Sequence, residues 1–183
     1  MSRVDRRPVA AVNDNVSTDG ADAEDCAETI AMTREIGALR FSAQFLVWSV
    51  RNWVQAFKAR SDFDVVTGGT FERFGLAVAA SALDRMMTVL AAAATRPIDI
   101  RCLRCRYLSP DEALLMEAVA AAQAENFFLA TVALRKLMPG SAARLALPHA
   151  ADLARDLHAA GMMLDDVAHE AAAERPPAHA LLH

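Results

Sequence analysis

The chain has 183 residues, enough for one compact domain with tails, and it is 54% hydrophobic but only 6% aromatic. Its net charge of −4 argues against a general nucleic-acid-binding protein, since such proteins carry a basic surface that releases counterions. Its longest apolar stretch, residues 74–94, is interrupted by Asp84 and Arg85, so no membrane-spanning helix is expected. Abundant alanine and leucine favour an all-α fold, a single-domain bundle of about five helices.

The chain divides into three regions by composition. Residues 1–23 are polar and charged, which predicts a disordered N-terminal arm. A helical bundle is expected over residues 24–168, followed by a flexible C-terminal tail over residues 169–183. The N-terminus lacks the apolar core of a secretory signal, and three cysteines fit reduced thiols better than a disulfide framework. We therefore expect a cytoplasmic protein, and the scarcity of lysine beside arginine suggests a GC-rich bacterial genome.

Apolar residues recur at steps of three and four from about residue 25 to residue 60, which predicts the first helix. Arg51 is assigned to its opposite, polar stripe. The apolar face of this helix is wider than the contact with a single neighbouring helix requires, because it also includes Phe41, Phe45 and Trp48. We predict that these aromatic residues form an interaction surface, most simply in a two-fold homodimer. Two alternatives remain open, namely ordinary core packing and a ligand pocket.

The second predicted helix runs from Thr70, taken as its cap, to Pro97, after a loop marked by two glycines. In the next segment, IDIRCLRCRYL at residues 98–108, apolar and polar residues alternate, and some of the apolar ones are β-branched. It is expected to be extended, or at most one short strand without a clear partner. It would form an arginine- and cysteine-rich connector in the middle of the bundle.

The motif SPDE predicts the start of the third helix. Ser109 is a suitable N-cap, Pro110 suits the first helical position, and Glu112 completes a capping box. Asp111 adds negative charge to the first turn, where it complements the helix dipole. These acidic residues therefore have a structural explanation, and no catalytic role is expected of them.

The bounds of the remaining helices are predicted from residues that cap or break helices. Asn126 is expected to end the third helix and cap a fourth over residues 127–137, with Phe128 facing inward. Pro148 is expected to open a fifth helix, which Gly161 closes.

Cys102 and Cys105 form the one CxxC pair and lie among Arg101, Arg104 and Arg106. Nearby positive charge favours a thiolate, so this cluster is a candidate thiol or anion-binding patch. A zinc site needs four ligands, and the chain supplies one such pair, so no cofactor is predicted and zinc at the pair remains the alternative. A third interpretation treats the cysteines as small, half-buried apolar residues beside solvated arginines.

Other catalytic patterns find little support in the sequence. It contains no nucleophile elbow, phosphate-binding loop or dinucleotide-binding turn. Two pairs, Asp165 with His169 and His149 with Asp152, can each share a helix face, but their spacing matches no known metal motif. The remaining histidines are His158, His179 and His183.

Together these observations predict a non-catalytic protein-interaction or regulatory protein that associates with itself or with a protein partner, and not with nucleic acid. The alternative is a metal- or thiol-based sensor centred on Cys102 and Cys105. A third hypothesis is an enzyme of unrecognised type with a pocket between helices.

Overall fold

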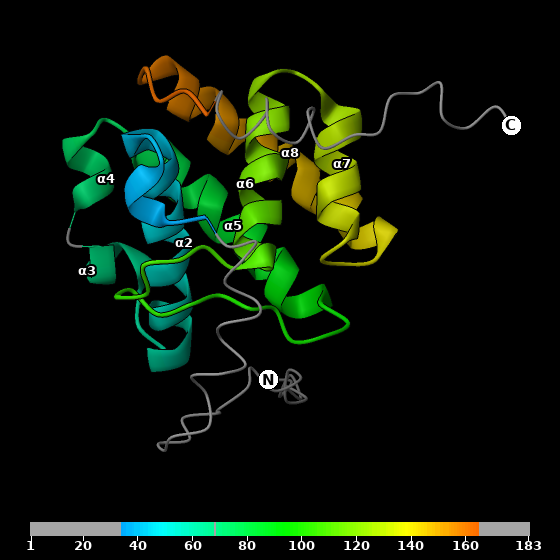
Figure 1. Ribbon diagram of the computed structural model, residues 1–183, viewed down its shortest axis with the longest axis horizontal. Coiled ribbons are helices and arrows are strands. Elements are labelled where there is room, and N and C mark those ends of the chain that lie inside the picture. Colours follow the sequence, from blue (N-terminus) through cyan, green and yellow to red (C-terminus); the bar gives the residue numbers. More distant parts are fainter. Residues whose placement is uncertain (1–33, 68, 165–183) are drawn as a thin grey trace, which may run out of the picture.

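The computed structural model describes residues 34–67 and 69–164, and these residues form the all-α fold that the composition predicted (Figure 1). The longer helices are α2 (Phe41–Ala59), α5 (Ala77–Ala93), α6 (Pro110–Gln123), α7 (Phe127–Arg135) and α8 (Gly140–Ala159). Three short helical segments lie beside α2 in the chain, η1 (Ile36–Ala38), α3 (Phe63–Thr67) and α4 (Thr70–Arg73). The predicted arm, the predicted tail and Cys26 lie outside the described residues. No described helix combines the length and apolar character needed to cross a membrane.

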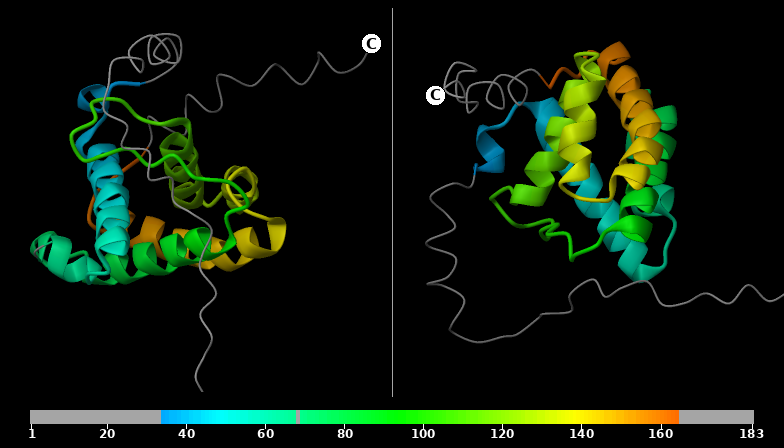
Figure 2. Two further views of the ribbon diagram at one scale, coloured as in Figure 1. Left: turned by 90° about the horizontal axis from the view of Figure 1, so that it is seen from below. Right: turned by 90° about the vertical axis from the view of Figure 1, so that its right-hand side faces the viewer.

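The most extensive helix contact joins α5 and α8, which lie side by side (Figures 1 and 2). Alanine supplies many of their buried side chains, among them Ala79 on α5 and Ala146 and Ala150 on α8. Small side chains allow two helices to approach closely, and alanine also has the highest helix propensity. The alanine-rich composition therefore serves both helix formation and packing.

Helices α6 and α7 form a hairpin that packs against α8. Asn126 caps α7 as predicted, since its side chain accepts a hydrogen bond from the backbone N–H of Leu129. The prediction for Phe128 was wrong, because its side chain is 76% exposed. Ala130, Ala133 and Leu134 fill the buried stripe of this helix, and Phe128 lies off that stripe.

The first long helix, α2, begins later than predicted, at Phe41. The preceding residues pair with the connector instead of continuing the helix. The Ile36 N–H donates to Arg106 O at 2.8 Å, the Leu108 N–H donates to Arg34 O at 2.9 Å, and Glu35 forms an antiparallel bridge with Tyr107. The extended connector thus has the partner that its sequence did not reveal.

A glycine divides the second predicted helix into α4 and α5. Gly75 has a φ of 70°, a conformation that suits glycine, and the Leu76 N–H donates back to Phe71 O at 2.7 Å. Thr70 is not the cap, because Gly69 occupies that position and Thr70 is already helical. The predicted loop before it also contains α3.

The last helix, α8, begins at Gly140 and continues through Pro148, so the prediction that Pro148 opens this helix was wrong. Pro148 is exposed, and Ala146 and Ala150 continue the buried stripe on both sides of it. Gly161 ends the helix as predicted, with a φ of 75° and its N–H donating to His158 O at 2.9 Å.

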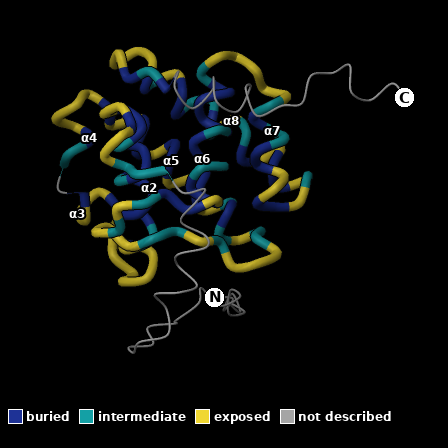
Figure 3. The backbone as a smooth tube through the Cα atoms, in the orientation of Figure 1, coloured by how far each residue is buried: buried dark blue, intermediate teal, exposed yellow. Residues whose placement is uncertain are grey.

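These helices share one core, with buried residues at the centre and exposed residues in loops and on outer faces (Figure 3). Phe45, Leu83, Leu115, Leu134 and Leu153 contribute one buried side chain each from α2, α5, α6, α7 and α8. The connector between α5 and α6 lies at the edge of this core and crosses α2 (Figure 1).

Candidate functional site in the connector between α5 and α6

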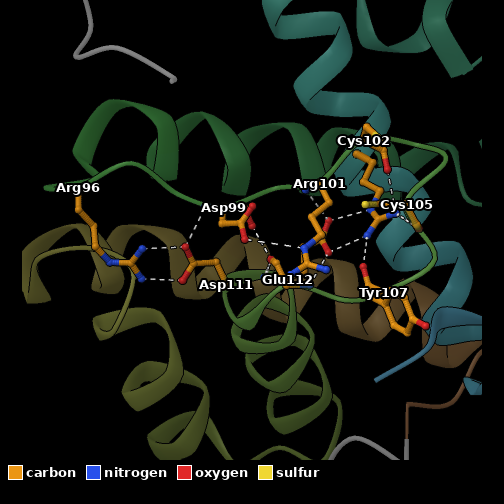
Figure 4. A network of polar contacts seen from close by, with 10 residues as sticks. Arg96, Asp99, Arg101, Cys102, Cys105, Tyr107, Asp111 and Glu112 are labelled. Carbon is orange, nitrogen blue, oxygen red and sulfur yellow. Dashed lines mark hydrogen bonds and ion pairs between the residues drawn. The ribbon is translucent and has the colours of Figure 1, made fainter. Parts of the chain in front are cut away.

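The connector, residues 94–109, has no regular secondary structure apart from the bridge at Tyr107. It makes a turn at the CxxC pair, where the Cys105 N–H donates to Cys102 O at 3.1 Å. Side chains from α2 and α6 hold this turn in place (Figure 4). A segment without sheet or helix needs such partners, because its buried backbone groups must still form hydrogen bonds.

Arg51 of α2 is the centre of this arrangement, with a side chain only 2% exposed. Its Nε and Nη2 donate to the two carboxylate oxygens of Glu112 at 2.7 and 2.9 Å. Its Nη1 donates to Cys102 O and Cys105 O at 2.9 and 2.7 Å, and its Nη2 also donates to Tyr107 O at 3.0 Å. A guanidinium has five N–H donors, so every donor of Arg51 has a partner.

Glu112 of α6 is equally occupied, with a side chain 1% exposed. Besides Arg51, its Oε1 accepts from the Arg101 N–H at 3.1 Å and its Oε2 accepts from the Ser109 N–H at 2.9 Å. The second of these bonds belongs to the predicted capping box, which the structure confirms. A carboxylate has about four acceptor positions, and here all of them are filled. The pair therefore has no free group for a substrate and acts as a structural element.

A second ion pair fixes the start of the connector. Arg96 donates to both carboxylate oxygens of Asp111, at 2.6 and 2.7 Å, and the Asp99 N–H donates to the same carboxylate at 2.8 Å. Burial raises the pKa of Asp111, but the hydrogen bonds from Arg96 and Asp99 outweigh it and hold the pKa below its usual value. Ser109 also donates from Oγ to Asp99 O at 2.5 Å. The N-cap and the first turn of α6 are thus both tied to the connector.

The two thiols at the turn differ in their surroundings. Cys102 is exposed and Cys105 is partly buried. Burial raises the pKa of Cys102, but the amides of Arg104 and Cys105, the Cys105 thiol and the charge of Arg51 outweigh it, so its pKa is lowered. Burial and the neighbouring Cys102 raise the pKa of Cys105. Of the two thiols, Cys102 is therefore both the more exposed and the one whose pKa is lowered.

The three predicted arginines of the patch have different roles. Arg106 forms an exposed ion pair with Glu35 at 2.6 Å. Arg101 lies 3.9 Å from Asp99, at the limit of an ion pair, and its backbone binds Glu112. Arg104 is exposed at the turn. Of the three, Arg101 is the one whose charge acts on a thiol, where it opposes the rise in the pKa of Cys105. The predicted patch itself stays a prediction. The arginine that binds the turn directly is Arg51, which the sequence assigned to a polar surface.

The aromatic residues proposed as an interaction surface do not share one environment. Phe41 is 58% exposed, Trp48 is partly buried, and Phe45 is only 6% exposed. Phe45 packs edge-on against Phe71 of α4, with ring centroids 5.2 Å apart. Phe41 contacts both Phe45 and the exposed Phe74, with ring centroids 6.2 and 5.8 Å away. Phe45 therefore belongs to the core, and the exposed aromatic surface consists of Phe41 and Phe74.

The other candidate sites are possible metal-binding groups, the histidines and one surface depression. The described part of the chain contains no group of three or more histidine, cysteine or acidic side chains placed to hold a metal ion. His149 and His158 lie on α8, and the other three histidines and Asp165 lie outside the described residues. A depression of about 390 Å³ lies between the α2–α3 corner and α5, and the predicted aromatic trio does not line it.

Comparison of the chain with the models of known protein families, with curated proteins and with solved structures found no match. The function can therefore be inferred only from the geometry of the connector. Sequence reasoning missed Arg51, although a signal was present. Arg51 follows Val47 by four residues and precedes Val54 by three, so helical spacing already placed it beside the apolar stripe.

Proposed function

We propose that this chain is a non-catalytic regulatory protein that responds to thiol oxidation through the Cys102–Cys105 pair. One observation carries the proposal. Two thiols three residues apart, one of them exposed, lie in a turn whose two cysteine carbonyls accept hydrogen bonds from the buried Arg51. A thiol pair fixed at such a turn suits reversible disulfide formation, because the second thiol is already beside the first.

The chemistry is a two-electron oxidation by a low-molecular-weight disulfide. The Cys102 thiolate attacks one sulfur of the disulfide, the sulfur–sulfur bond breaks, and one thiolate leaves. Cys105 then loses its proton to solvent and attacks the sulfur of Cys102 in this mixed disulfide. The second thiolate leaves, and the Cys102–Cys105 disulfide remains. The protein loses two electrons and two protons, and the disulfide is reduced to two thiols.

The surroundings of the pair favour regulation over catalysis. Arg51 and Glu112, the side chains that hold the turn, are fully engaged in hydrogen bonds within the protein. A general acid or base needs a free position within hydrogen-bond reach of its substrate. Oxidation of the pair to a disulfide would instead alter the positions of the two cysteine carbonyls that Arg51 binds. Because Arg51 belongs to α2 and pairs with Glu112 of α6, a change at the thiols would reach both helices.

Treatment of the reduced protein with a small excess of bis(2-hydroxyethyl) disulfide tests the proposal. We expect the mass of the protein to fall by two hydrogen atoms, and peptide mapping to find Cys102 joined to Cys105. The same result is expected for Cys26→Ser, which serves as the matched control. Cys105→Ser should stop at a mixed disulfide on Cys102. A wild-type protein that keeps two free thiols at these positions, or that cross-links either of them to Cys26, would contradict the proposal.

The cytoplasmic location, the self-association and the protein partner expected from the sequence stay predictions. Zinc at Cys102 and Cys105 likewise stays the alternative to thiol oxidation, and elemental analysis of the purified protein addresses it.

A further inference from the structure

Directly after the CxxC turn, the connector pairs with residues 34–36, which we call the strap. Arg106 O accepts a hydrogen bond from the Ile36 N–H at 2.8 Å, and the Leu108 N–H donates to Arg34 O at 2.9 Å. These two bonds belong to an antiparallel bridge, so the strap lies along one edge of the extended end of the connector.

The opposite edge of the same extended segment is bound by Arg51. Its guanidinium donates to Cys105 O at 2.7 Å and to Tyr107 O at 3.0 Å. Successive backbone carbonyls of an extended chain point to opposite sides, so these two carbonyls face the guanidinium while the carbonyl of Arg106 faces the strap. A displacement of Cys105 therefore acts on both edges of the segment.

The two edges are held with unequal strength. Arg51 is 2% exposed, makes five hydrogen bonds, and pairs with the buried carboxylate of Glu112. The strap is bound by neutral backbone groups and by the ion pair of Glu35 with Arg106, whose side chains are 44% and 76% exposed. Breaking a buried ion pair costs several times more free energy than breaking a neutral hydrogen bond or an exposed ion pair. Strain in the segment is therefore relieved at the strap.

Resting on the proposed thiol–disulfide function, we infer that the strap is the part of the molecule that responds to oxidation, and that it loosens from the connector when the Cys102–Cys105 disulfide forms. A disulfide imposes a fixed separation and torsion on its two cysteines, which two free thiols do not. The turn has to meet this requirement while Arg51 limits the movement of the two cysteine carbonyls. The adjustment passes along the segment to its weaker edge. Loosening of the strap uncovers Arg106 O and the Leu108 N–H, a backbone edge to which an extended peptide can add.

Amide hydrogen exchange of the full chain tests the inference, with Cys26→Ser as the background so that the pair supplies the only thiols. The reduced protein is compared with the protein oxidised by bis(2-hydroxyethyl) disulfide, and its mass verifies the oxidation. We expect the Ile36 and Leu108 amides to exchange about fivefold faster in the oxidised protein, which is about the effect of losing one neutral hydrogen bond. The amide of Ala154, buried on α8, should exchange at the same rate in both forms.

Thermodynamic linkage requires the reverse effect, namely that a weaker strap favours the disulfide. Ile36→Pro removes the N–H that binds Arg106 O, at the first position of η1, where proline is accepted. Ile36→Val is the matched control, because it keeps the N–H and most of the side chain. In mixtures of bis(2-hydroxyethyl) disulfide and 2-mercaptoethanol, Ile36→Pro should shift the equilibrium toward the protein disulfide by up to about fivefold. Ile36→Val should leave the equilibrium unchanged.

Unchanged or slower exchange of the strap amides on oxidation, or an equilibrium that Ile36→Pro does not move, would overturn the inference. Equally faster exchange at Ala154 would also overturn it, because the whole fold and not the strap would then respond. The proposed function would survive either result, since the disulfide itself would have formed. A protein in which Cys102 and Cys105 form no disulfide would overturn both.

Discussion

Helix α2 contributes to two regions of the molecule, one around Phe45 and one around Arg51, and different interactions stabilise them. Near its start, Phe45 is buried by aromatic neighbours, and its neighbour Phe41 is left exposed. In its middle, Arg51 is buried just as deeply, but by directional hydrogen bonds to Glu112 and to the connector. Apolar packing needs only a suitable volume, whereas the Arg51 contacts require particular atoms at particular places. The connector, which has no sheet or helix of its own, depends on the second kind.

The largest effect in this comparison is expected at Arg51. Arg51→Met leaves the buried carboxylate of Glu112 without its counter-charge and leaves three carbonyls without a donor. Removing one partner of a buried ion pair costs about 3–5 kcal/mol of unfolding free energy. Urea denaturation measures this loss, with Arg85→Met on the exposed face of α5 as the control. Similar midpoints for the two variants would show that the network does not hold the connector.

In the aromatic region, substitutions of the buried Phe45 and of the exposed Phe41 should lower the free energy of unfolding by different amounts. Phe45→Ala removes a ring that is 6% exposed and should cost about 3 kcal/mol, through lost burial and a remaining cavity. Phe41→Ala is the matched variant, and because its ring is 58% exposed, a change of less than about 1 kcal/mol is expected. Thermal unfolding of both proteins gives the comparison. Equal losses at the two positions would mean that Phe41 is also buried, for instance in a self-associated protein.

A smaller effect is expected at the cap that joins the connector to α6. Ser109→Ala removes the side-chain acceptor of the Glu112 N–H, which lies 3.0 Å away. Loss of an N-cap costs about 1 kcal/mol, so the protein should fold normally with a lower unfolding midpoint. Ser141→Ala at an exposed site on α8 provides the control. A loss as large as that of Arg51→Met would mean that the cap, and not the ion pair, organises this end of the molecule.

The parts of the fold that depend on local signals could be predicted from the sequence. The capping box at Ser109 and Glu112, the cap at Asn126 and the helix end at Gly161 are encoded by neighbouring residues, and the structure confirms them. The start of α2 could not be predicted in this way. Residues 34–36 pair with the connector, which lies far along the chain, and this contact replaces the expected helical turns.

The candidate site was only partly predictable for the same reason. Cys102, Cys105 and the surrounding arginines are recognisable as a group because they are adjacent in the sequence. The ion pair that fixes them joins Arg51 to Glu112 across 61 residues, and arginine is rarely buried without such a partner. A periodicity argument that treats every arginine as polar surface therefore misplaces Arg51. Asking which charged residues lie within an apolar stripe would have identified it.

The difference between the two thiols decides which of them reacts first, and limited alkylation measures it directly. The folded, reduced protein is treated with less than one equivalent of iodoacetamide near neutral pH, and peptide mass mapping identifies the first cysteine modified in the pair. Cys102 is exposed and its pKa is lowered, whereas the pKa of the partly buried Cys105 is raised by burial and by Cys102, so Cys102 should react first. The preference should disappear in denaturant, where both thiols are solvated. Equal labelling in the folded protein, or labelling of Cys105 before Cys102, would contradict the arrangement that Arg51 is inferred to hold.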